Sequence, residues 1–289
     1  MKMKKLLSVV LAAACVLSMT ACGGDNKGSK DAVTAEVIDI ELTSEEYAFG
    51  VDKNQPELLQ QTNDFIAKIQ EDGTFDEICD HYFGDGEPVG IEAPSEADAS
   101  KDQLIVATNT EFAPFEYMEG NKYYGIDMEI AQLLADELGK ELVIVNMSFD
   151  AVCLSVQQGK CDIAMAGLTV NEERKEAVEF SATYYNAAQK LVVASNNTEF
   201  ADCKDAADVE AILAEKDSKT KIGVQTGTTA QFYCEGDADW GFDGFGVETV
   251  GYNNGSLAVQ DMLSGNIDYV MIDSAPAAAI TSAINAMVQ

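Results

Sequence analysis

The chain has 289 residues, of which 47% are hydrophobic and 24% are charged, and its formal net charge is −32. This apolar content suffices for one two-lobed domain or two small domains, so general disorder is excluded. Such a negative surface repels nucleic acid and favours solubility, and we therefore expect no nucleic-acid partner.

The first residues predict an exported protein with a lipid anchor. Three lysines precede a short apolar run that ends at Cys22. The run is too short to span a bilayer with margin, which favours a signal peptide over residues 1–21. The small residues before Cys22 resemble a bacterial lipobox, in which the cysteine becomes the lipidated first residue, and residues 22–34 then form a tether. Ordinary secretory cleavage is the alternative, because Met19 stands where a lipobox usually has Leu.

Five cysteines remain after Cys15 is removed with the signal and Cys22 carries lipid. Their number is odd and no Cys-x-x-Cys spacing occurs, so neither a zinc ribbon nor a redox pair is indicated. We expect buried free thiols, and one disulfide remains possible. The five are Cys79, Cys153, Cys161, Cys203 and Cys234.

The segment 35–84 predicts two strands followed by two helices. The stretches "AEVIDIEL" (35–42) and "SEEYAFGV" (44–51) have the composition of strands, whereas residues 56–70 have apolar residues at helical spacing. The second helix covers residues 74–84. It resembles the last helix of a domain, although it lies near the start of the chain.

Two features frame that second helix. Thr74 and Glu77 have the spacing of a capping box, in which each side chain caps the other's backbone N–H. After Gly84 the chain enters the acidic, Pro/Gly/Ala/Ser-rich stretch 85–101, whose composition is typical of a linker. The apolar side of the helix is formed by Phe75, Ile78, Tyr82 and Phe83.

From Asp102 onward, strands and helices alternate. The helix at 127–140 has Asp127 as its expected N-cap and Gly139 as its stop. Strands separated by helices of this length predict an α/β class with parallel pairing, and polar loops after the strands mark the edge where such sheets bind ligands. The expected strands are 103–108, 141–147, 162–167, 190–195, 221–225, 247–251 and 267–272. The other expected helices are one that reaches Gly159, 171–180, 205–215, 228–234, 255–264 and 275–286.

Several stretches carry a family resemblance. They are "ATNTEFAPFEY" (107–117), "GIDMEIAQLLADELGK" (125–140), "AMAGLTVNEERKEAVEFS" (164–181), "GVQTGTT" (223–229) and "GNIDYVMID" (265–273). In this order and spacing the sequence resembles the polar amino-acid-binding proteins of bacterial ABC importers, which are family 3 solute-binding proteins with the type II periplasmic-binding-protein fold. The resemblance implies two lobes, each with a mixed sheet flanked by helices, and a ligand cleft between them.

The order of the segments departs from that family. A family member ordinarily continues after the last helix with a strand, a crossing back to the first lobe, then a strand, a long helix and a short helix ending in "YFG". Here these pieces resemble residues 35–84, which predicts a circular permutation. Termini that lie close together and the slow growth of loop-closure cost make such a rearrangement easy. An independent appendage formed by 35–84, or a domain-swapped dimer, is the alternative.

The permuted arrangement assigns each segment to a lobe. Residues 35–43 supply a strand of lobe 2, residues 44–84 the C-terminal-type part of lobe 1, and residues 85–101 the linker between the old termini. Residues 102–195 form the main part of lobe 1 and residues 196–289 that of lobe 2. If this is right, strand 36–42 lies in the same sheet as "YVMID".

The ligand candidates follow from the charges of a free amino acid. A carboxylate is suited to the planar fork of Arg174, and an ammonium group to the carboxylate of Asp273 on the other lobe. Without the resemblance, Arg174 would be an ordinary surface arginine and Asp273 a helix N-cap. The resemblance further implies contacts from Asn109, Glu111, Phe112, Phe149, Gly167, Leu168, Thr169, Gln225, Thr228 and Thr229.

The expected function is a lipid-anchored receptor on the outer face of the cell membrane that delivers an amino acid to an ABC importer permease. Asn109 stands where several relatives have Asp, so arginine, lysine, histidine and glutamine-like ligands all remain open. The alternative is an enzyme on the same fold, such as a cyclohexadienyl dehydratase or a cell-wall lytic enzyme. His81 is the sole histidine, which makes histidine-based chemistry improbable and leaves Glu111 as the candidate acid. We expect no cofactor and no metal.

Overall fold

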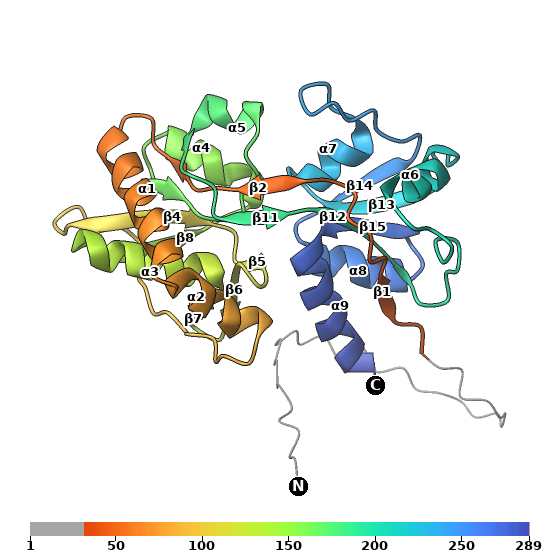
Figure 1. Ribbon diagram of the computed structural model, residues 1–289, viewed down its shortest axis with the longest axis horizontal. Coiled ribbons are helices and arrows are strands. Elements are labelled where there is room, and N and C mark those ends of the chain that lie inside the picture. Colours follow the sequence, from red (N-terminus) through yellow and green to blue (C-terminus); the bar gives the residue numbers. More distant parts are fainter. Residues whose placement is uncertain (1–31, 289) are drawn as a thin grey trace, which may run out of the picture.

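Lobe 1 is built on a five-stranded mixed sheet in the computed structural model, which describes residues 32–288 (Figure 1). In sheet order the strands are β10 (Glu179–Phe180), β3 (Gly50–Val51), β9 (Ile163–Ala164), β4 (Gln103–Thr108) and β8 (Glu141–Asn146). β4 is parallel to both β8 and β9, whereas β3 is antiparallel to β9 and β10. Helices pack on this sheet, which is why its central strands are almost entirely apolar and buried.

Helices from two separate stretches of the chain surround this sheet. They are α1 (Pro56–Glu71), α2 (Thr74–Phe83), α3 (Ile126–Leu138), the 3-10 turn η1 (Phe149–Ala151), α4 (Val152–Gln157) and α5 (Glu172–Ala177). α1 buries Leu58, Phe65, Ile66 and Ile69, whose spacing places them on one face. That face packs with α2 and α3 in one apolar core. A small antiparallel sheet is formed by β5 (Glu111–Phe112), β6 (Glu116–Glu119) and β7 (Lys122–Tyr124).

Lobe 2 is built on a second five-stranded mixed sheet. In sheet order its strands are β1 (Ala35–Val37), β12 (Gln189–Ala194), β15 (Tyr269–Asp273), β13 (Lys221–Gln225) and β14 (Glu248–Tyr252). β13 is parallel to β14 and β15, whereas β12 is antiparallel to β1 and β15. Its helices are α6 (Ala206–Ala214), α7 (Thr229–Glu235), α8 (Gly255–Leu263) and α9 (Ser274–Val288). The prediction of two mixed sheets flanked by helices is confirmed.

A two-stranded ribbon joins the lobes, as Figure 1 shows between the two sheets. It consists of β2 (Glu45–Tyr47) and β11 (Tyr185–Ala187), which pair antiparallel. Burial alternates along β2, with Glu45 and Tyr47 buried and Glu46 exposed, as the two-residue period of a strand requires. The chain crosses between the lobes at these two strands, so this hinge ribbon carries side chains that face both lobes.

The segment 35–84 contributes to both lobes. β1 pairs with β12, which in turn pairs with β15, so β1 lies in the same sheet as Tyr269–Asp273. Beyond β1, the amide of Leu42 donates to the carbonyl of Gln189 (2.9 Å). β3 lies within the sheet of lobe 1, and α1 and α2 pack against α3. The alternative of an independent unit over 35–84 is therefore wrong.

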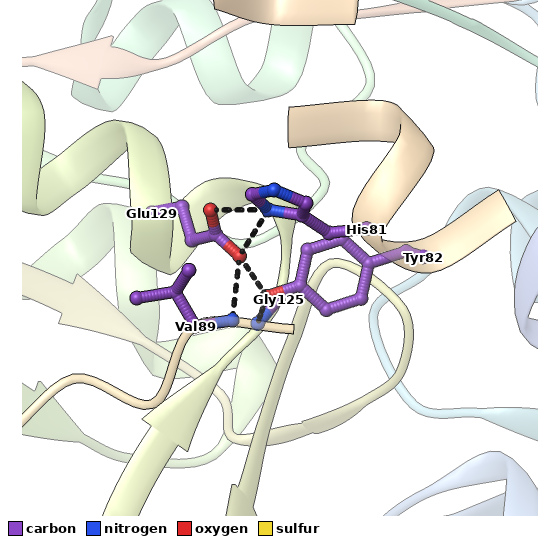
Figure 2. A network of polar contacts seen from close by, with 5 residues as sticks. All are labelled: His81, Tyr82, Val89, Gly125 and Glu129. Carbon is purple, nitrogen blue, oxygen red and sulfur yellow. Dashed lines mark hydrogen bonds and ion pairs between the residues drawn. The ribbon is translucent and has the colours of Figure 1, made fainter. Parts of the chain in front are cut away.

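The stretch after α2 is fixed to lobe 1 by a buried carboxylate (Figure 2). Glu129 on α3 accepts hydrogen bonds from the amide of Val89 (3.1 Å) and the hydroxyl of Tyr82 (2.5 Å), and one of its oxygens lies 2.9 Å from Nδ1 of His81. The Tyr82 hydroxyl in turn accepts a hydrogen bond from the amide of Gly125 (2.8 Å). One carboxylate thus ties the last turn of α2, the following segment and the start of α3 together.

Residues 85–101 are bound to the sheet region at further points. Ile91 and Tyr123 exchange two backbone hydrogen bonds of 2.8 and 2.9 Å, and the amide of Ile144 donates to the carbonyl of Pro94 (3.0 Å). Composition indicated a linker, and the segment does join α2 to β4. These contacts hold it along lobe 1, a feature that composition does not encode.

Two predicted helix starts are wrong. The N-cap of α2 is Gly73, with φ of 87°, and Thr74 is already helical, so no capping box forms. The N-cap of α3 is Gly125, and Asp127 lies inside the helix. A Cβ at Gly125 would come within 2.0 Å of the Phe115 carbonyl oxygen, so this close approach of two backbone segments requires glycine.

Two further predictions need correction. The boundary placed at residue 195 is wrong, because β12 lies in the sheet of lobe 2 and lobe 1 ends before the hinge strand β11. Phe83 was placed on the apolar side of its helix, but it is 51% exposed. It stacks on Tyr185 at a ring-centroid distance of 6.1 Å instead of entering the core.

The remaining composition-based expectations have simple outcomes. All five cysteines between residues 32 and 288 are free thiols. Within the same residues no group of His, Cys, Asp or Glu side chains has the arrangement of a metal site. None of the helices in that range is both long and apolar enough to cross a bilayer. The predicted signal peptide and Cys22 lie outside the described residues.

Candidate ligand-binding site

The lobes meet where strands from each sheet end. Asn109 follows β4 of lobe 1, and Gln225 ends β13 of lobe 2. Nε2 of Gln225 donates a hydrogen bond to Oδ1 of Asn109 (3.1 Å), while Nδ2 of Asn109 donates to the Met147 carbonyl (2.8 Å). Both side chains are buried. The lobes are thus closed against each other at the sheet edges where the sequence places a ligand cleft.

Arg174 on α5 also bridges the lobes. Its Nη1 donates to the Thr169 carbonyl of lobe 1 (2.7 Å), and its Nη2 donates to the Gly227 carbonyl of lobe 2 (3.0 Å). The N-cap Asn171 accepts a hydrogen bond from the Arg174 amide (2.6 Å) and begins the helix. Arg174 is therefore a buried guanidinium, and the two bonds use only two of its five N–H groups.

The two aromatic candidates are both buried but have different partners. Phe149 lies under Arg174, whose Cζ is 5.1 Å from the ring centroid, so it stacks on a protein cation here. Phe112 stacks on Phe115 at 6.1 Å. Phe112 also borders Gly167, where an added Cβ would lie 3.0 Å from the ring. Phe149 thus supports the arginine, whereas Phe112 forms a wall beside the Gly167 turn.

The loop at Gly167–Thr169 passes between β9 and α5. Gly167 has φ of +53°, a left-handed conformation that favours glycine. The carbonyl of Leu168 accepts a hydrogen bond from the amide of Ala48 (3.0 Å). The hydroxyl of Thr169 donates to Oε2 of Glu45 on the hinge ribbon (2.8 Å). The loop is therefore attached to the hinge at two successive residues.

Asp273 ends β15 and faces the same hinge strand. Its carboxylate accepts a hydrogen bond from the hydroxyl of Tyr47 (2.6 Å). Burial, and after it the neighbouring charge of Glu45, raises the pKa of Asp273 to about 7. Arg174 donates to Thr169, Thr169 donates to Glu45, and Tyr47 donates to Asp273, while Glu45 and Tyr47 share the buried face of β2. We call these five residues the polar group, which runs from lobe 1 through the hinge to lobe 2.

The candidates at the start of α7 add polar atoms from lobe 2. The hydroxyl of Thr228 donates to the Gln225 carbonyl (2.8 Å). In the part of the chain that the structure describes, Oγ1 of Thr229 and Oε1 of Gln225 are buried without a hydrogen-bond partner. Glu111 differs from every other candidate because it is exposed on β5. The other eleven candidates are all buried.

Residues 104–287 match the family of bacterial extracellular solute-binding proteins, family 3. The chain belongs to this family.

Relatives of this family 3 protein include the arginine-binding extracellular protein ArtP of Bacillus subtilis, 30% identical over 62% of this chain and 64% of the relative. An L-arginine-binding protein of Pseudomonas aeruginosa is 29% identical over 52% of each chain. The histidine-binding periplasmic protein of Salmonella typhimurium is 27% identical over 61% of this chain and 62% of the relative. The matches span less than two thirds of these relatives' lengths.

Solved structures show the same fold. An ancestral arginine-binding protein bound to arginine is 34% identical, with a TM-score of 0.53, and covers 63% of this chain and 75% of the other. An ancestral amino acid-binding protein described as a precursor of cyclohexadienyl dehydratase also has a TM-score of 0.53, at 30% identity, and covers 64% and 75% of the two chains. The architecture of both lobes thus follows the type II periplasmic-binding-protein fold.

Two residues of the polar group lie outside the family match and were missed from the sequence of this family 3 protein. Glu45 and Tyr47 belong to the hinge strand β2, ahead of residue 104. The sequence does contain a pattern that indicates them. Glu45 and Tyr47 alternate with Glu46 and so share a strand face with the apolar residues that follow. A glutamate on a buried strand face is rare enough to warrant a search for partners.

Two more buried carboxylates lie near the cleft. Asp127 accepts hydrogen bonds from the Gly167 amide (2.9 Å) and the Tyr184 hydroxyl (2.6 Å), and burial raises its pKa to about 7. Glu116 on β6 is fully buried, and within residues 32–288 neither of its carboxylate oxygens has a hydrogen-bond partner. Burial, together with the charges of Asp127 and Asp273, raises the pKa of Glu116 well above its usual range. Burial therefore favours the protonated form of Glu116.

Two hollows on the surface of this family 3 protein lie away from the polar group. One, of about 490 Å³, is bordered by the start of α1 together with Gln103, Lys140 and Asp162. The other, of about 440 Å³, lies between α5 and Asp237–Trp240. Neither is lined by Thr169, Arg174 or Asp273. The buried polar residues at the interface between the lobes are therefore separate from these two surface hollows.

Proposed function

We propose that this protein is an extracytoplasmic receptor that captures one polar L-amino acid by closing its two lobes and delivers it to an ABC-type importer. One observation carries the proposal. A buried guanidinium on lobe 1, Arg174, and a buried carboxylate on lobe 2, Asp273, are linked to the same hinge strand, Arg174 through Thr169 and Asp273 directly. These groups complement the carboxylate and ammonium of a zwitterion, and neither lobe supplies both.

The charge balance of the cleft favours a ligand with a basic side chain. Of the cleft residues described above, Arg174 is a cation, whereas Glu45, Glu116, Asp127 and Asp273 carry buried carboxyl groups. A second positive charge on the ligand would stabilise the ionised forms of these carboxyl groups. The relatives include arginine- and histidine-binding proteins, and one similar solved structure is an ancestral arginine-binding protein bound to glutamine. We therefore place arginine first, then lysine and histidine, and glutamine after them.

A panel titration tests this function. Purified protein is titrated by calorimetry at pH 8 with each of the twenty common L-amino acids. We expect saturable binding at one site, strongest for a basic amino acid. Binding of none of them, combined with turnover of prephenate or arogenate, would favour the dehydratase alternative. That alternative lacks a buried acid at the predicted position, because Glu111 is exposed.

We also infer that the chain is exported and anchored by lipid at Cys22. The support is the sequence of residues 1–22, a basic start followed by a short apolar run and small residues before the cysteine. Expression in a bacterium with labelled palmitate should give a labelled, membrane-bound protein. Cys22→Ser should release the protein from the membrane without changing its affinity for the ligand.

We further infer that the segment order is a circular permutation of the family order. The support is that residues 35–84 supply β1 to lobe 2, and β3, α1 and α2 to lobe 1. The amide of Ala35 donates to Oδ1 of Asn285 on α9 (2.8 Å), and Nδ2 of Asn285 donates to the Ala35 carbonyl (2.8 Å). The end of α9 therefore lies beside the start of β1, within reach of a short connection.

Re-ordering the chain tests the permutation. Residues 85–288 are placed first, so that the contacts of residues 85–101 with lobe 1 are kept, and are joined through a short Gly/Ser linker to residues 33–84. We expect a cooperatively folded monomer with unchanged ligand affinity, because every strand pair can form as before. A re-ordered chain that fails to bind, while the original order binds, would contradict the permutation and leave the receptor function untouched.

A further inference from the structure

Glu45 occupies an unusual position for a glutamate. It is the first residue of the hinge strand β2, pairs with Ala187 and is only 4% exposed. Its carboxylate accepts three hydrogen bonds, to Oε1 from the Thr43 hydroxyl (2.6 Å) and Nε2 of Gln189 (2.9 Å), and to Oε2 from the Thr169 hydroxyl (2.8 Å). All three donors are neutral. None of the ion pairs within residues 32–288 includes Glu45, so its charge is held by neutral dipoles alone.

These hydrogen bonds determine whether the Thr169 hydroxyl can donate or accept a hydrogen bond in the cleft. A hydroxyl has one proton, and that of Thr169 is donated to Glu45. The oxygen therefore presents lone pairs and can only accept a hydrogen bond from a ligand. An ammonium group is a suitable donor, whereas a carboxylate oxygen facing these lone pairs would be repelled.

We propose that Glu45 is a positioning residue that fixes the Thr169 hydroxyl as a hydrogen-bond acceptor and whose charge acts on the neighbouring carboxylate of Asp273. This assignment rests on the proposed function, because it describes how the same cleft receives the ligand ammonium group. Arg174, at the other end of the polar group, remains for the ligand carboxylate.

The environment of Asp273 supports the second part of the role. Tyr47, two residues after Glu45 on β2, donates a hydrogen bond to the Asp273 carboxylate, and Gln189, which donates to Glu45, pairs with Asp273 between β12 and β15. The titratable groups that interact with Asp273 are Glu45, Tyr47, Glu116 and Tyr185. None of these groups is a cation. Burial and the charge of Glu45 raise the pKa of Asp273 to about 7, so the free protein holds a proton there as the pH falls below neutrality.

The sign of the resulting pH dependence follows directly. An ammonium group needs the ionised carboxylate, so a ligand must displace the Asp273 proton. Affinity is therefore full well above pH 7 and is lost as the pH falls through 7. Removal of the Glu45 charge would lower the pKa of Asp273 and move this loss to lower pH.

Glu45→Gln tests both effects at once. One amide oxygen can accept the bonds from Thr43 and Gln189, and the amide NH₂ then donates to Thr169, which turns the threonine proton toward the ligand. We measure calorimetric affinity from pH 5.5 to 8.5 for the amino acid that the wild type binds best. At pH 8.5 we expect affinity to fall by at least about tenfold, the scale of a reversed hydrogen bond to a charged group. The pH at which half of the affinity is lost should move to lower values.

Two further variants separate this role from general effects. Glu46→Gln removes the same charge from the same strand at an exposed position and should leave both the affinity and its pH profile unchanged. In a Thr169→Val background, Glu45→Gln should have a much smaller effect at pH 8.5, because no hydroxyl remains to be reversed. If the variants are additive, the hydroxyl is not the route by which Glu45 acts, and the inference fails.

The outcomes distinguish the inference from the function it rests on. Wild-type protein that binds none of the amino acids overturns both. Wild-type protein that binds, with Glu45→Gln indistinguishable from Glu46→Gln, overturns only the role of Glu45. Should Glu45→Gln fail to fold, proton release by the wild type decides. Titration in buffers of different ionisation enthalpy should show more protons released on binding at pH 6.5 than at pH 8.5, and equal release at both values contradicts the inference.

Discussion

The guanidinium of Arg174 and the carboxylate of Asp273 are the two charged ends of the cleft, and different kinds of atoms hold them. Arg174 is fixed by main-chain carbonyls, Thr169 from one lobe and Gly227 from the other. Asp273 is held by a side chain of the hinge, the Tyr47 hydroxyl, and by the charge of Glu45. The position of the Arg174 guanidinium is therefore set by main-chain atoms, whereas the pKa of Asp273 depends on neighbouring side chains.

This difference has a consequence for pH. A guanidinium remains charged throughout the physiological range, so the end that we propose for the ligand carboxylate keeps its charge. At the end that we propose for the ligand ammonium group, burial and the charge of Glu45 raise the pKa of Asp273 to about 7. The charge of Arg174 is thus constant with pH, whereas the charge of Asp273 depends on the pH and on its neighbours.

Removing either charged end should have the largest effect. Arg174→Ala and Asp273→Ala should each weaken amino-acid binding by about 2–5 kcal/mol, because each leaves one ligand charge buried without a partner. Calorimetry at pH 6 and pH 8 separates the effects of the two substitutions. The loss from Arg174→Ala should be the same at both pH values, whereas the loss from Asp273→Ala should be greater at pH 8, where the wild-type carboxylate is ionised. Equal losses at both pH values for both variants would remove the contrast between the ends.

Asp127 is a second buried carboxylate, held by one main-chain amide, that of Gly167, and one side chain, Tyr184. Its pKa is about 7 in the folded protein and 3.8 in the unfolded reference, so the folded state binds an extra proton between these values. The stability it provides is present below pH 3.8 and is lost as the pH rises through 7. Asp127→Asn should therefore reduce the decline in unfolding free energy from pH 4 to pH 7 by about 1–4 kcal/mol.

Chemical denaturation at several pH values checks this expectation. Asn at this position can still accept from the Gly167 amide and can donate to the Tyr184 oxygen, so the packing is conserved. Asp136→Asn provides the control, because it makes the same change on the exposed face of α3. A pH dependence of Asp127→Asn that matches Asp136→Asn would show that Asp127 does not hold the extra proton.

Tyr47→Phe should weaken binding less than loss of Asp273 itself. The substitution removes the one hydroxyl bond to the carboxylate, which corresponds to about 1.5 kcal/mol or roughly tenfold in affinity. It should also raise the pKa of Asp273 further, so that the loss is greater at pH 7 than at pH 8.5. Tyr185→Phe, on the partner strand of the hinge, is the control, because its hydroxyl has no hydrogen-bond partner within the described residues. Similar effects of the two substitutions would indicate general loosening of the hinge.

Phe149→Leu should give the smallest effect of the set. It removes the ring beneath Arg174 but leaves both backbone bonds of the guanidinium in place. The expected weakening is about 0.5–1 kcal/mol, the scale of a cation–π contact, and is measured by calorimetry alongside the thermal midpoint. A loss as large as that of Arg174→Ala would mean that the ring, and not the main chain, holds the cation.

Local sequence patterns predicted the elements well where one stretch of chain decides them. The strand at 103–108 is β4 and the strand at 221–225 is β13, because continuous apolar runs identify buried strands. Helix starts were less accurate. Asp127 has the chemistry of an N-cap, but its carboxylate binds Gly167 and Tyr184, which lie 40 and 57 residues away in sequence. A local pattern does not encode such long-range partners.

The same distinction applies to the site. The family resemblance located Arg174, Thr169 and Asp273, which the structure brings into one polar group. The resemblance did not identify Glu45 and Tyr47, because their contacts with the cleft residues depend on the hinge strand passing between the two lobes. It also placed Glu111 with the ligand contacts, although that side chain lies exposed at the edge of a small sheet. Sequence identifies groups within the family's motifs more readily than groups on a strand that crosses from a distant part of the chain.

Ligand truncation tests the central claim most directly, namely that the two lobes share the recognition of one zwitterion. The wild type is titrated at pH 8 with L-arginine, with agmatine, which lacks the carboxylate, and with 5-guanidinopentanoate, which lacks the ammonium group. We expect saturable binding of arginine and a loss of at least about thirtyfold for each analogue, the lower limit for an unpaired buried charge. Agmatine and 5-guanidinopentanoate binding as tightly as arginine would contradict the assignment of Arg174 and Asp273.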